Sequence, residues 1–165
     1  MMQQQNRDRP RQGGGFYQPD TRTDFRFDDK YLKGGYFSDA KRENLRPELL
    51  DTVAMDVAKR LINSGINSYQ LRRFYNQVRA IERSVGTQRS FEAAKADIVA
   101  LKSAVAYQVG RGLVREDFKR FIDRNADLAK ENADNLTRGF IPHFGAVLGF
   151  FVYLKPDERG FDRRR

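Results

Sequence analysis

The sequence predicts an all-α protein, a single bundle of about five helices with a disordered N-terminal tail. Residues 45–154 carry apolar side chains at helical spacing in five successive segments, most of them separated by glycine or a capping residue. No segment of similar length alternates apolar and polar residues as a strand does. These residues suffice for one core and are too few for two domains.

The five helices are expected at residues 47–64, 68–85, 91–109, 114–132 and 135–154. Polar caps precede the second and third helices, and glycines follow the first three. The caps are Asn67 or Ser68 and Ser90, and the glycines are Gly65, Gly86 and Gly110. The first helix should bury a stripe that begins at Leu50 and ends at Leu61. Pro142 should kink the last helix or mark its true start, because proline lacks a backbone N–H.

Both ends of the chain are predicted to be flexible. Residues 1–44 contain two glycine runs and mixed charges without a helical period, so we expect them to be largely disordered when free. Their aromatic residues favour partial ordering on a partner, by stacking on bases or lying in a groove; a vector-derived or solubilising tail is the alternative. These residues are Phe16, Tyr17, Phe25, Phe27, Tyr31, Tyr36 and Phe37. Residues 155–165 end in three arginines and form a basic C-terminal tail.

The second helix has the most informative pattern. Its apolar face consists of Leu71, Phe74, Tyr75, Val78 and Ile81. Its polar face carries a basic stripe of Arg72, Asn76, Arg79 and Arg83. At about 1.5 Å per residue this stripe is roughly 16 Å long. A row of guanidinium groups suits a phosphate backbone, and the alternative is a solvated polar face.

Other cations are weaker candidates for RNA contacts. Arg73 points about 100° away from Arg72, toward RNA or a neighbouring subunit. Lys59 and Arg60 end the first helix, where cations complement the helix dipole whether or not they bind anything. Arg115, Lys119 and Arg120 rank below the basic stripe, because carboxylates around the fourth helix, Glu116 and Asp123 among them, can neutralise cations at i, i+4 spacing.

Composition favours a polyanionic partner and disfavours catalysis. The net charge is +9, from 31 Lys and Arg against 22 Asp and Glu. The chain has no cysteine, so thiolate catalysis and thiolate metal sites are excluded. Its one histidine, His143, lacks a matching acid or second histidine and is expected to be structural. Phosphate-loop and dinucleotide-binding motifs are absent, so we expect no enzyme activity, metal or cofactor.

Nothing in the sequence indicates a membrane protein. The longest apolar run, residues 146–154, is far shorter than the roughly 20 residues that span a bilayer. The amino terminus lacks the apolar stretch of a secretory signal. We therefore expect a cytoplasmic protein.

Two segments carry a family resemblance. They are SYQLRRFYNQV at residues 68–78 and NLTRGFIPHFGAVLGFFVYLK at residues 135–155. With the order of helices between them, residues 45–155 resemble the small helical subunit of type III-A CRISPR interference complexes, the Csm-type effector. The tail of 44 residues is longer than this family leads us to expect.

The resemblance implies a small, non-catalytic subunit of an antiviral ribonucleoprotein. Such a subunit is present in more than one copy and lies along a filament of repeated backbone subunits, near the large subunit. It lines the channel where guide RNA pairs with target RNA. Arg72, inside the matching motif, becomes the strongest candidate for an RNA contact.

Two other functions fit the same residues. A free-standing helical RNA-binding protein, such as a ribosome-associated factor, would use the basic stripe but would purify without repeated subunits or a guide. A structural adaptor would direct its positive charge at acidic protein partners and would carry no nucleic acid. Stoichiometry and nucleic-acid content of the native complex separate the three.

Overall fold

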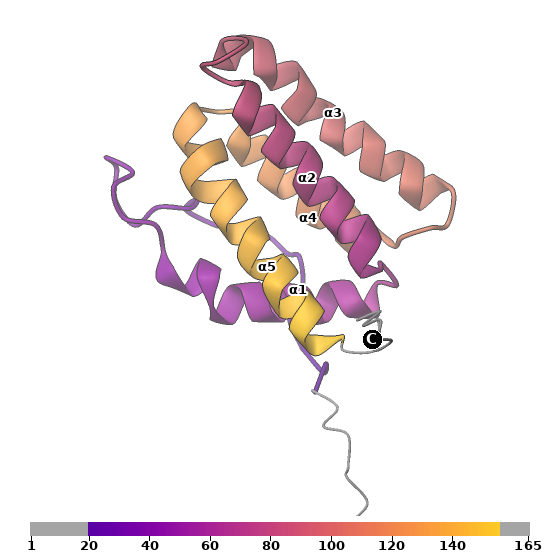
Figure 1. The fold of residues 1–165 in the computed structure, drawn as a ribbon. Coiled ribbons are helices and arrows are strands. Elements are labelled where there is room, and N and C mark those ends of the chain that lie inside the picture. The colour runs from indigo at the N-terminus through magenta and orange to yellow at the C-terminus, as the bar shows by residue number, and fades with distance from the viewer. Residues whose placement is uncertain (1–19, 156–165) are drawn as a thin grey trace, which may run out of the picture.

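The computed structural model describes residues 20–155 and contains five α-helices in that range (Figure 1). They are α1 (Thr52–Asn63), α2 (Ser68–Ser84), α3 (Phe91–Gly110), α4 (Glu116–Ala129) and α5 (Ile141–Leu154). A 3-10 turn, η1 (Pro47–Leu50), precedes α1, and a π-helical turn, η2 (Asn135–Phe140), precedes α5. The described residues form two isolated β-bridges and no strand. The predicted all-α bundle is confirmed.

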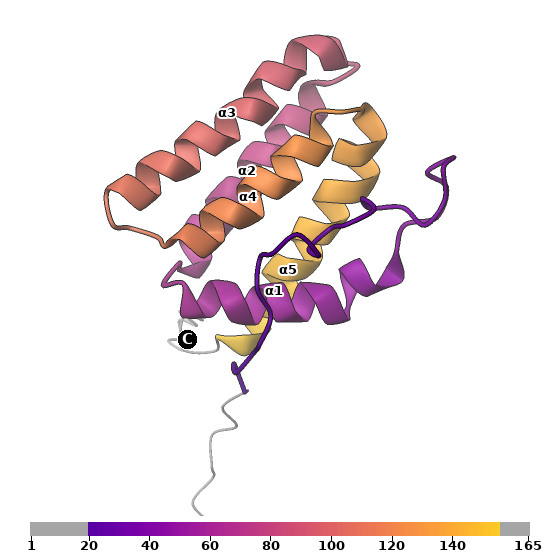
Figure 2. The same cartoon turned by 180° about the vertical axis from the view of Figure 1, so that it is seen from behind.

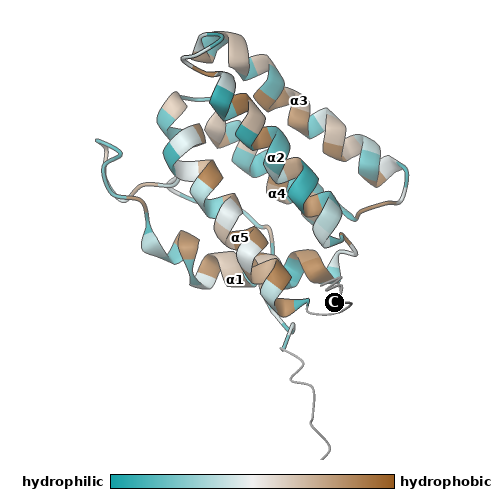
Figure 3. Ribbon diagram, viewed as in Figure 1, coloured by the Kyte–Doolittle hydropathy of each residue, from teal (hydrophilic) through white to brown (hydrophobic). Residues whose placement is uncertain are grey.

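The helices are arranged with α2 on one face of the bundle and α4 on the opposite face (Figures 1 and 2). Helix α5 packs against α1 and α2, and α3 packs against α4. Helix α1 crosses one end of the other four (Figures 1 and 2). Hydrophilic residues lie along the outward side of α2 (Figure 3). The α2 surface is therefore open to a partner along its length.

Local signals fix the limits of α2 and α3 as predicted. The Asn67 side chain accepts a hydrogen bond from the Gln70 backbone N–H at 2.8 Å, and the Gln70 side chain accepts from the Asn67 N–H at 3.0 Å. This reciprocal capping box satisfies two amides that the first turn leaves unpaired. Ser90 caps α3 through its hydroxyl oxygen. Gly86 follows α2 at φ +79°, a conformation that favours glycine.

The predicted helix over residues 47–64 is interrupted. Asp51 has φ −130° and ψ −101°, outside the helical region, so η1 and α1 are separate elements. As a result Leu49 is buried, at 1% exposure, whereas Leu50 is 40% exposed. The prediction that the buried stripe begins at Leu50 is therefore wrong, because the break shifts the register of the preceding turn.

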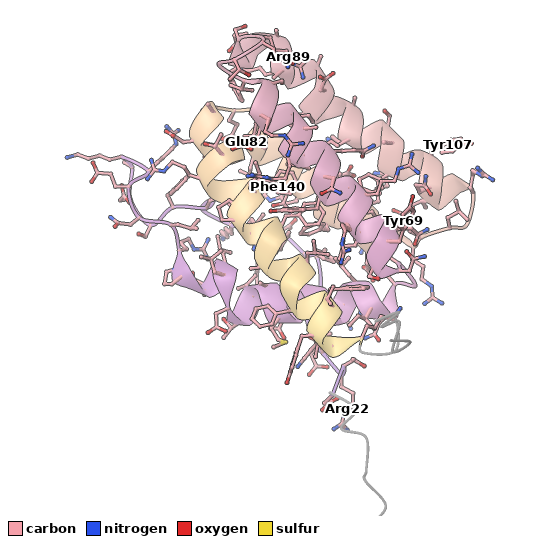
Figure 4. All side chains as sticks on the ribbon, viewed as in Figure 1. Arg22, Tyr69, Glu82, Arg89, Tyr107 and Phe140 are labelled. Atoms are coloured by element: carbon pink, nitrogen blue, oxygen red, sulfur yellow. The ribbon has the colours of Figure 1, made fainter. Side chains whose placement is uncertain are left out.

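The last predicted helix, residues 135–154, combines two kinds of helix. Pro142 lies in the first turn of α5, after η2, where its missing N–H is tolerated. Pro142 thus marks the start of the α-helix, which is one of the two predicted outcomes. Phe140 lies inside the bundle (Figure 4), and among the other aromatic residues Phe144 is buried while Tyr153 is 52% exposed. Core packing accounts for most of the aromatic content here.

Residues 20–44, the N-terminal segment, pack against the bundle, contrary to the prediction of disorder over residues 1–44. Tyr31, Leu32 and Tyr36 are 4%, 2% and 1% exposed and belong to the core. The Arg124 side chain of α4 donates hydrogen bonds of 3.3 Å to the backbone carbonyls of Tyr31 and Leu32. These three side chains are irregularly spaced in the sequence, so no periodic pattern predicted their burial. The rest of the predicted tails, residues 1–19 and 156–165, lies outside the described residues.

Candidate nucleic-acid interface

Helix α2 presents its basic stripe because its opposite face is anchored in the core. Leu71 and Val78 are fully buried, and the Phe74 ring meets Phe118 of α4 edge-on, with ring centres 5.0 Å apart. The capping box fixes the start of the helix, so the register of its exposed face is set locally. The polar side chains at intervals of three and four residues therefore share one outward surface.

The structure divides the basic stripe into free and neutralised members. Arg72, Asn76 and Arg83 are exposed, and within the described residues their side chains have neither a hydrogen-bond partner nor an ion pair. Arg79 is different, because its Nη1 lies 3.2 Å from Oε2 of Glu82. Its guanidinium is already matched by a carboxylate and attracts an incoming phosphate less strongly. The stripe thus presents two free guanidinium groups, not three.

Arg60 and Lys59, the cations at the end of α1, differ from the free arginines of the stripe in their contacts. Arg60 Nε donates to Oδ2 of Asp117 at 2.7 Å, which links α1 to the start of α4. Such a part-buried pair holds two helices together, and its cation is not free for RNA. Hydrogen bonds from Arg22 lower the pKa of Asp20, and the charge of half-buried Lys59 adds a smaller effect in the same direction.

Of the three cations ranked below the basic stripe, Lys119 and Arg120 form ion pairs, and Arg115 Nη1 donates to the Asn63 carbonyl at 3.3 Å. Lys119 pairs with Asp123 at the predicted i, i+4 spacing. Arg120 lies 4.0 Å from Asp117, where Glu116 was the predicted partner. Lys102 of α3 pairs with Asp127 of α4 at 3.0 Å. The Lys102 pair links α3 to α4, whereas the Lys119 and Arg120 pairs lie within α4.

Arg73 lies beside Arg72, because both line a shallow pocket on α2 that also includes Tyr69. Arg73 also lines a groove between α2 and α3, together with Tyr69, Tyr107 and Arg111. Tyr69 and Tyr107 are 73% and 61% exposed. The sequence reasoning missed this groove, because only the packing of α3 beside α2 brings residues 69–73 and 107–111 together. An available signal was a tyrosine on the polar side of each helix.

The single imidazole is part of the core. His143 is fully buried; its Nδ1 donates to the Leu49 carbonyl at 2.6 Å, and its Nε2 lies 2.8 Å from the Tyr31 hydroxyl. Burial lowers the pKa of His143 to about 4, against a smaller opposing effect of the Leu49 hydrogen bond. These contacts support the predicted structural role.

The described residues contain neither a cluster of metal-binding side chains nor an apolar helix of membrane-spanning length. No group of three or more His, Cys, Asp or Glu side chains is placed to hold a metal ion in that part of the chain. Within the same residues no helix is long and apolar enough to cross a membrane.

The fold and this face define a small all-α protein that presents free arginines on one anchored helix. Residues 44–157 match the family model described as Csm2 Type III-A. The match covers more than half of the chain, so the protein belongs to this family, and it is a small subunit of a type III-A CRISPR complex. The resemblance seen in the sequence is confirmed. No curated protein and no solved structure matches the chain.

Proposed function

We propose that this subunit holds the backbone of the guide RNA–target RNA duplex in its complex, through the free members of the basic stripe. The proposal depends on one observation: Arg72 and Arg83 are exposed on one helix face without an ion pair among the described residues. In guide-directed complexes base pairing reads the sequence and the protein holds the backbone. Two guanidinium groups roughly 16 Å apart on a rigid helix suit that task.

The distribution of ion pairs supports this proposal. Among the cations within the described α-helices, four have neither an ion pair nor a hydrogen bond. They are Lys59, Arg72, Arg73 and Arg83. Three of the four lie on α2, whereas the cations of α3 and α4 meet carboxylates or backbone carbonyls. Free positive charge is therefore concentrated on the helix that carries the family motif.

We also propose that the subunit takes no part in RNA cleavage chemistry. Its only histidine is buried with both ring nitrogens engaged, so it cannot exchange a proton with a bound RNA. The chain contains no cysteine. Its contribution is to neutralise and align the duplex alongside repeated backbone subunits, the large subunit and further copies of itself in the cytoplasm.

The test compares two double variants of equal charge in the reconstituted complex. Arg72→Ala with Arg83→Ala removes the free guanidinium groups, while Arg26→Ala with Arg120→Ala removes two exposed guanidinium groups from the N-terminal segment and α4. The first pair should weaken target-RNA binding about tenfold and lower the salt slope by about two, and the control pair should change neither. Equal behaviour of the two pairs would show that the stripe is only a solvated face.

The rate of target-RNA cleavage shows whether the subunit aligns the RNA or takes part in the reaction itself. At saturating target RNA, the rate of cleavage by an intact complex should stay within a few-fold for the Arg72 and Arg83 variants. His143→Asn should have the same small effect. A loss of more than about a hundredfold, roughly 2.7 kcal/mol of transition-state stabilisation, would contradict the non-catalytic role.

A further inference from the structure

The α2–α3 groove is a second polar surface, which adjoins the basic stripe along α2. It has a volume of about 670 Å³ and contains no acidic side chain among its lining residues, although the chain has 22 Asp and Glu. Its charged residues are Arg73 and Arg111 only. Amide side chains, including Gln77 and Gln108, add neutral donors and acceptors. Charge complementarity therefore favours an anionic occupant with polar edges.

Two tyrosines stand at this groove, one from each helix. Tyr69 and Tyr107 lie at the same end of the bundle (Figure 4) and are 73% and 61% exposed. Arg111 lies over the Tyr107 ring at 5.6 Å from its centre, and its Nη1 donates to the Tyr107 hydroxyl at 3.4 Å. Large exposed aromatic rings are a surface on which nucleic-acid bases stack.

We propose that this groove binds a short single-stranded stretch of RNA, with Tyr69 and Tyr107 stacking on bases and Arg73 and Arg111 contacting phosphates. Single-stranded RNA is recognised by aromatic and arginine side chains that stack on unpaired bases, which a duplex does not offer. The basic stripe meets the groove at Tyr69, which shares a shallow pocket with Arg72 and Asn76, but only the groove has a second exposed tyrosine, Tyr107. The proposal rests on the proposed function only in naming RNA as the ligand class.

The spacing of the lining residues supports a strand that runs along the groove. On α2, Tyr69, Arg73 and Gln77 recur every four residues, and Ser103 and Tyr107 of α3 are followed at the same interval by Arg111, the residue that caps α3. Each row is about 12 Å long at a rise of roughly 1.5 Å per residue. At about 3.4 Å per stacked nucleotide, each row accommodates roughly three nucleotides. Each wall thus carries one tyrosine and one arginine four residues apart.

A protein segment is the competing occupant, since tyrosine and arginine are also enriched at protein interfaces. The absence of acidic lining residues, and two arginines that have no ion pair among the described residues, favour nucleic acid over a neutral peptide. Substitution of Tyr69 and Tyr107 by phenylalanine distinguishes an RNA strand from a protein segment. Phenylalanine still stacks on bases but lacks the hydroxyl that a polar protein contact would need.

The test measures fluorescence anisotropy of the full chain with a labelled oligouridylate and with an RNA duplex of the same length. Tyr69→Ala with Tyr107→Ala should weaken single-strand binding about tenfold or more and leave duplex binding within about twofold. Tyr69→Phe with Tyr107→Phe should retain single-strand binding within about threefold. Tyr153→Ala is the matched control, because this tyrosine is 52% exposed but lies on α5.

Three results would overturn the groove proposal. One is unchanged single-strand binding by the alanine pair, and another is an equal loss in the phenylalanine pair. The third is loss of assembly with other subunits while RNA binding persists, which would assign the groove to a protein partner. Ultraviolet crosslinking adds a direct readout: peptides containing Tyr69 or Tyr107 should carry the crosslinked uridine, and their absence among crosslinked peptides would count against it.

The two proposals fail separately. Arg72→Ala with Arg83→Ala should reduce duplex binding and leave the tyrosine-dependent loss of single-strand binding in place. If duplex binding does not depend on the stripe but single-strand binding still depends on the tyrosines, the proposed function fails and the groove proposal stands. If duplex binding depends on the stripe but single-strand binding does not depend on the tyrosines, the proposed function stands and the groove proposal fails.

Discussion

The Tyr31 hydroxyl donates a hydrogen bond to Nε2 of His143 over 2.8 Å and joins the N-terminal segment to α5. The direction of this bond is fixed, because Nδ1 of the neutral ring must donate to the Leu49 carbonyl, which can only accept. Asn125 of α4 extends this hydrogen-bond network. Its Nδ2 donates to the Tyr31 hydroxyl at 3.0 Å, and its Oδ1 accepts from the Tyr36 hydroxyl at 2.7 Å. Every member of this buried network has a matching partner.

The network predicts a pH dependence of stability. Burial lowers the pKa of His143 from 6.5 to about 4, so the unfolded chain binds a proton at a higher pH than the folded chain does. The His143 contribution to stability is therefore fully present above pH 6.5 and is lost as the pH falls toward about 4. Over that range the free energy of unfolding should decrease by about 3 kcal/mol, measured by urea unfolding.

His143→Asn is the matched control for this pH effect, because the Asn amide can still donate toward Leu49 but does not titrate. Its stability should fall less steeply between pH 6.5 and about 4 than that of the wild type. As the chain has one histidine, its imidazole signals in an NMR titration are assigned directly. A midpoint near 6.5 in the folded protein would contradict the burial of His143.

Gly139→Ala should destabilise the fold. A Cβ at this position would lie 2.6 Å from Cγ of the Tyr36 ring, and Tyr36 is 1% exposed and cannot move freely. We expect a loss of about 1–3 kcal/mol in the free energy of unfolding. Gly149→Ala is the matched control, because a Cβ there meets nothing within 4 Å in α5, so it should stabilise the helix by about 0.5–1 kcal/mol. Equal effects of the two substitutions would refute the close contact at Tyr36.

Removal of the N-terminal segment should be far more damaging than removal of the residues before it. A chain that begins at residue 20 keeps every contact described here, whereas one that begins at residue 45 loses three core side chains. Burial of each is worth about 1.5–3 kcal/mol, a large share of the 5–15 kcal/mol typical of a domain. Thermal unfolding should show a large drop in midpoint for the second chain only, and a synthetic peptide of residues 20–44 should restore part of it.

Glu82→Gln should strengthen RNA binding. Glu82 Oε2 is 3.2 Å from Arg79 but lacks an aligned hydrogen bond in the described structure, so its loss costs little stability and releases the Arg79 guanidinium. We expect an affinity gain of about two- to fivefold and a salt slope about one unit steeper. Glu92→Gln makes the same charge change on α3 and should leave binding nearly unchanged. An equal gain from both substitutions would mean that net charge, not the stripe, controls binding.

The sequence alone determined most of the helices and the exposed face of α2. Caps such as Asn67 and Ser90 act on the next three residues, and apolar side chains recur with the helical period, so both are readable from local spacing. The Arg79–Glu82 pair was also readable, since its i, i+3 spacing is a local signal that the stripe pattern overlooked. Asp51, the N-cap residue of α1, was a further local signal, since aspartate is favoured at helix starts, although its side chain makes no capping hydrogen bond.

Only the tertiary structure decided what the N-terminal segment does and which cations stay free. Tyr31 meets His143 across 112 positions and Arg60 meets Asp117 across 57, and no periodic pattern links such distant residues. The α2–α3 groove likewise exists because Tyr69 and Tyr107 lie on helices that pack side by side. Helix formation depends on near neighbours, whereas burial and ion pairing depend on which segments the core brings together.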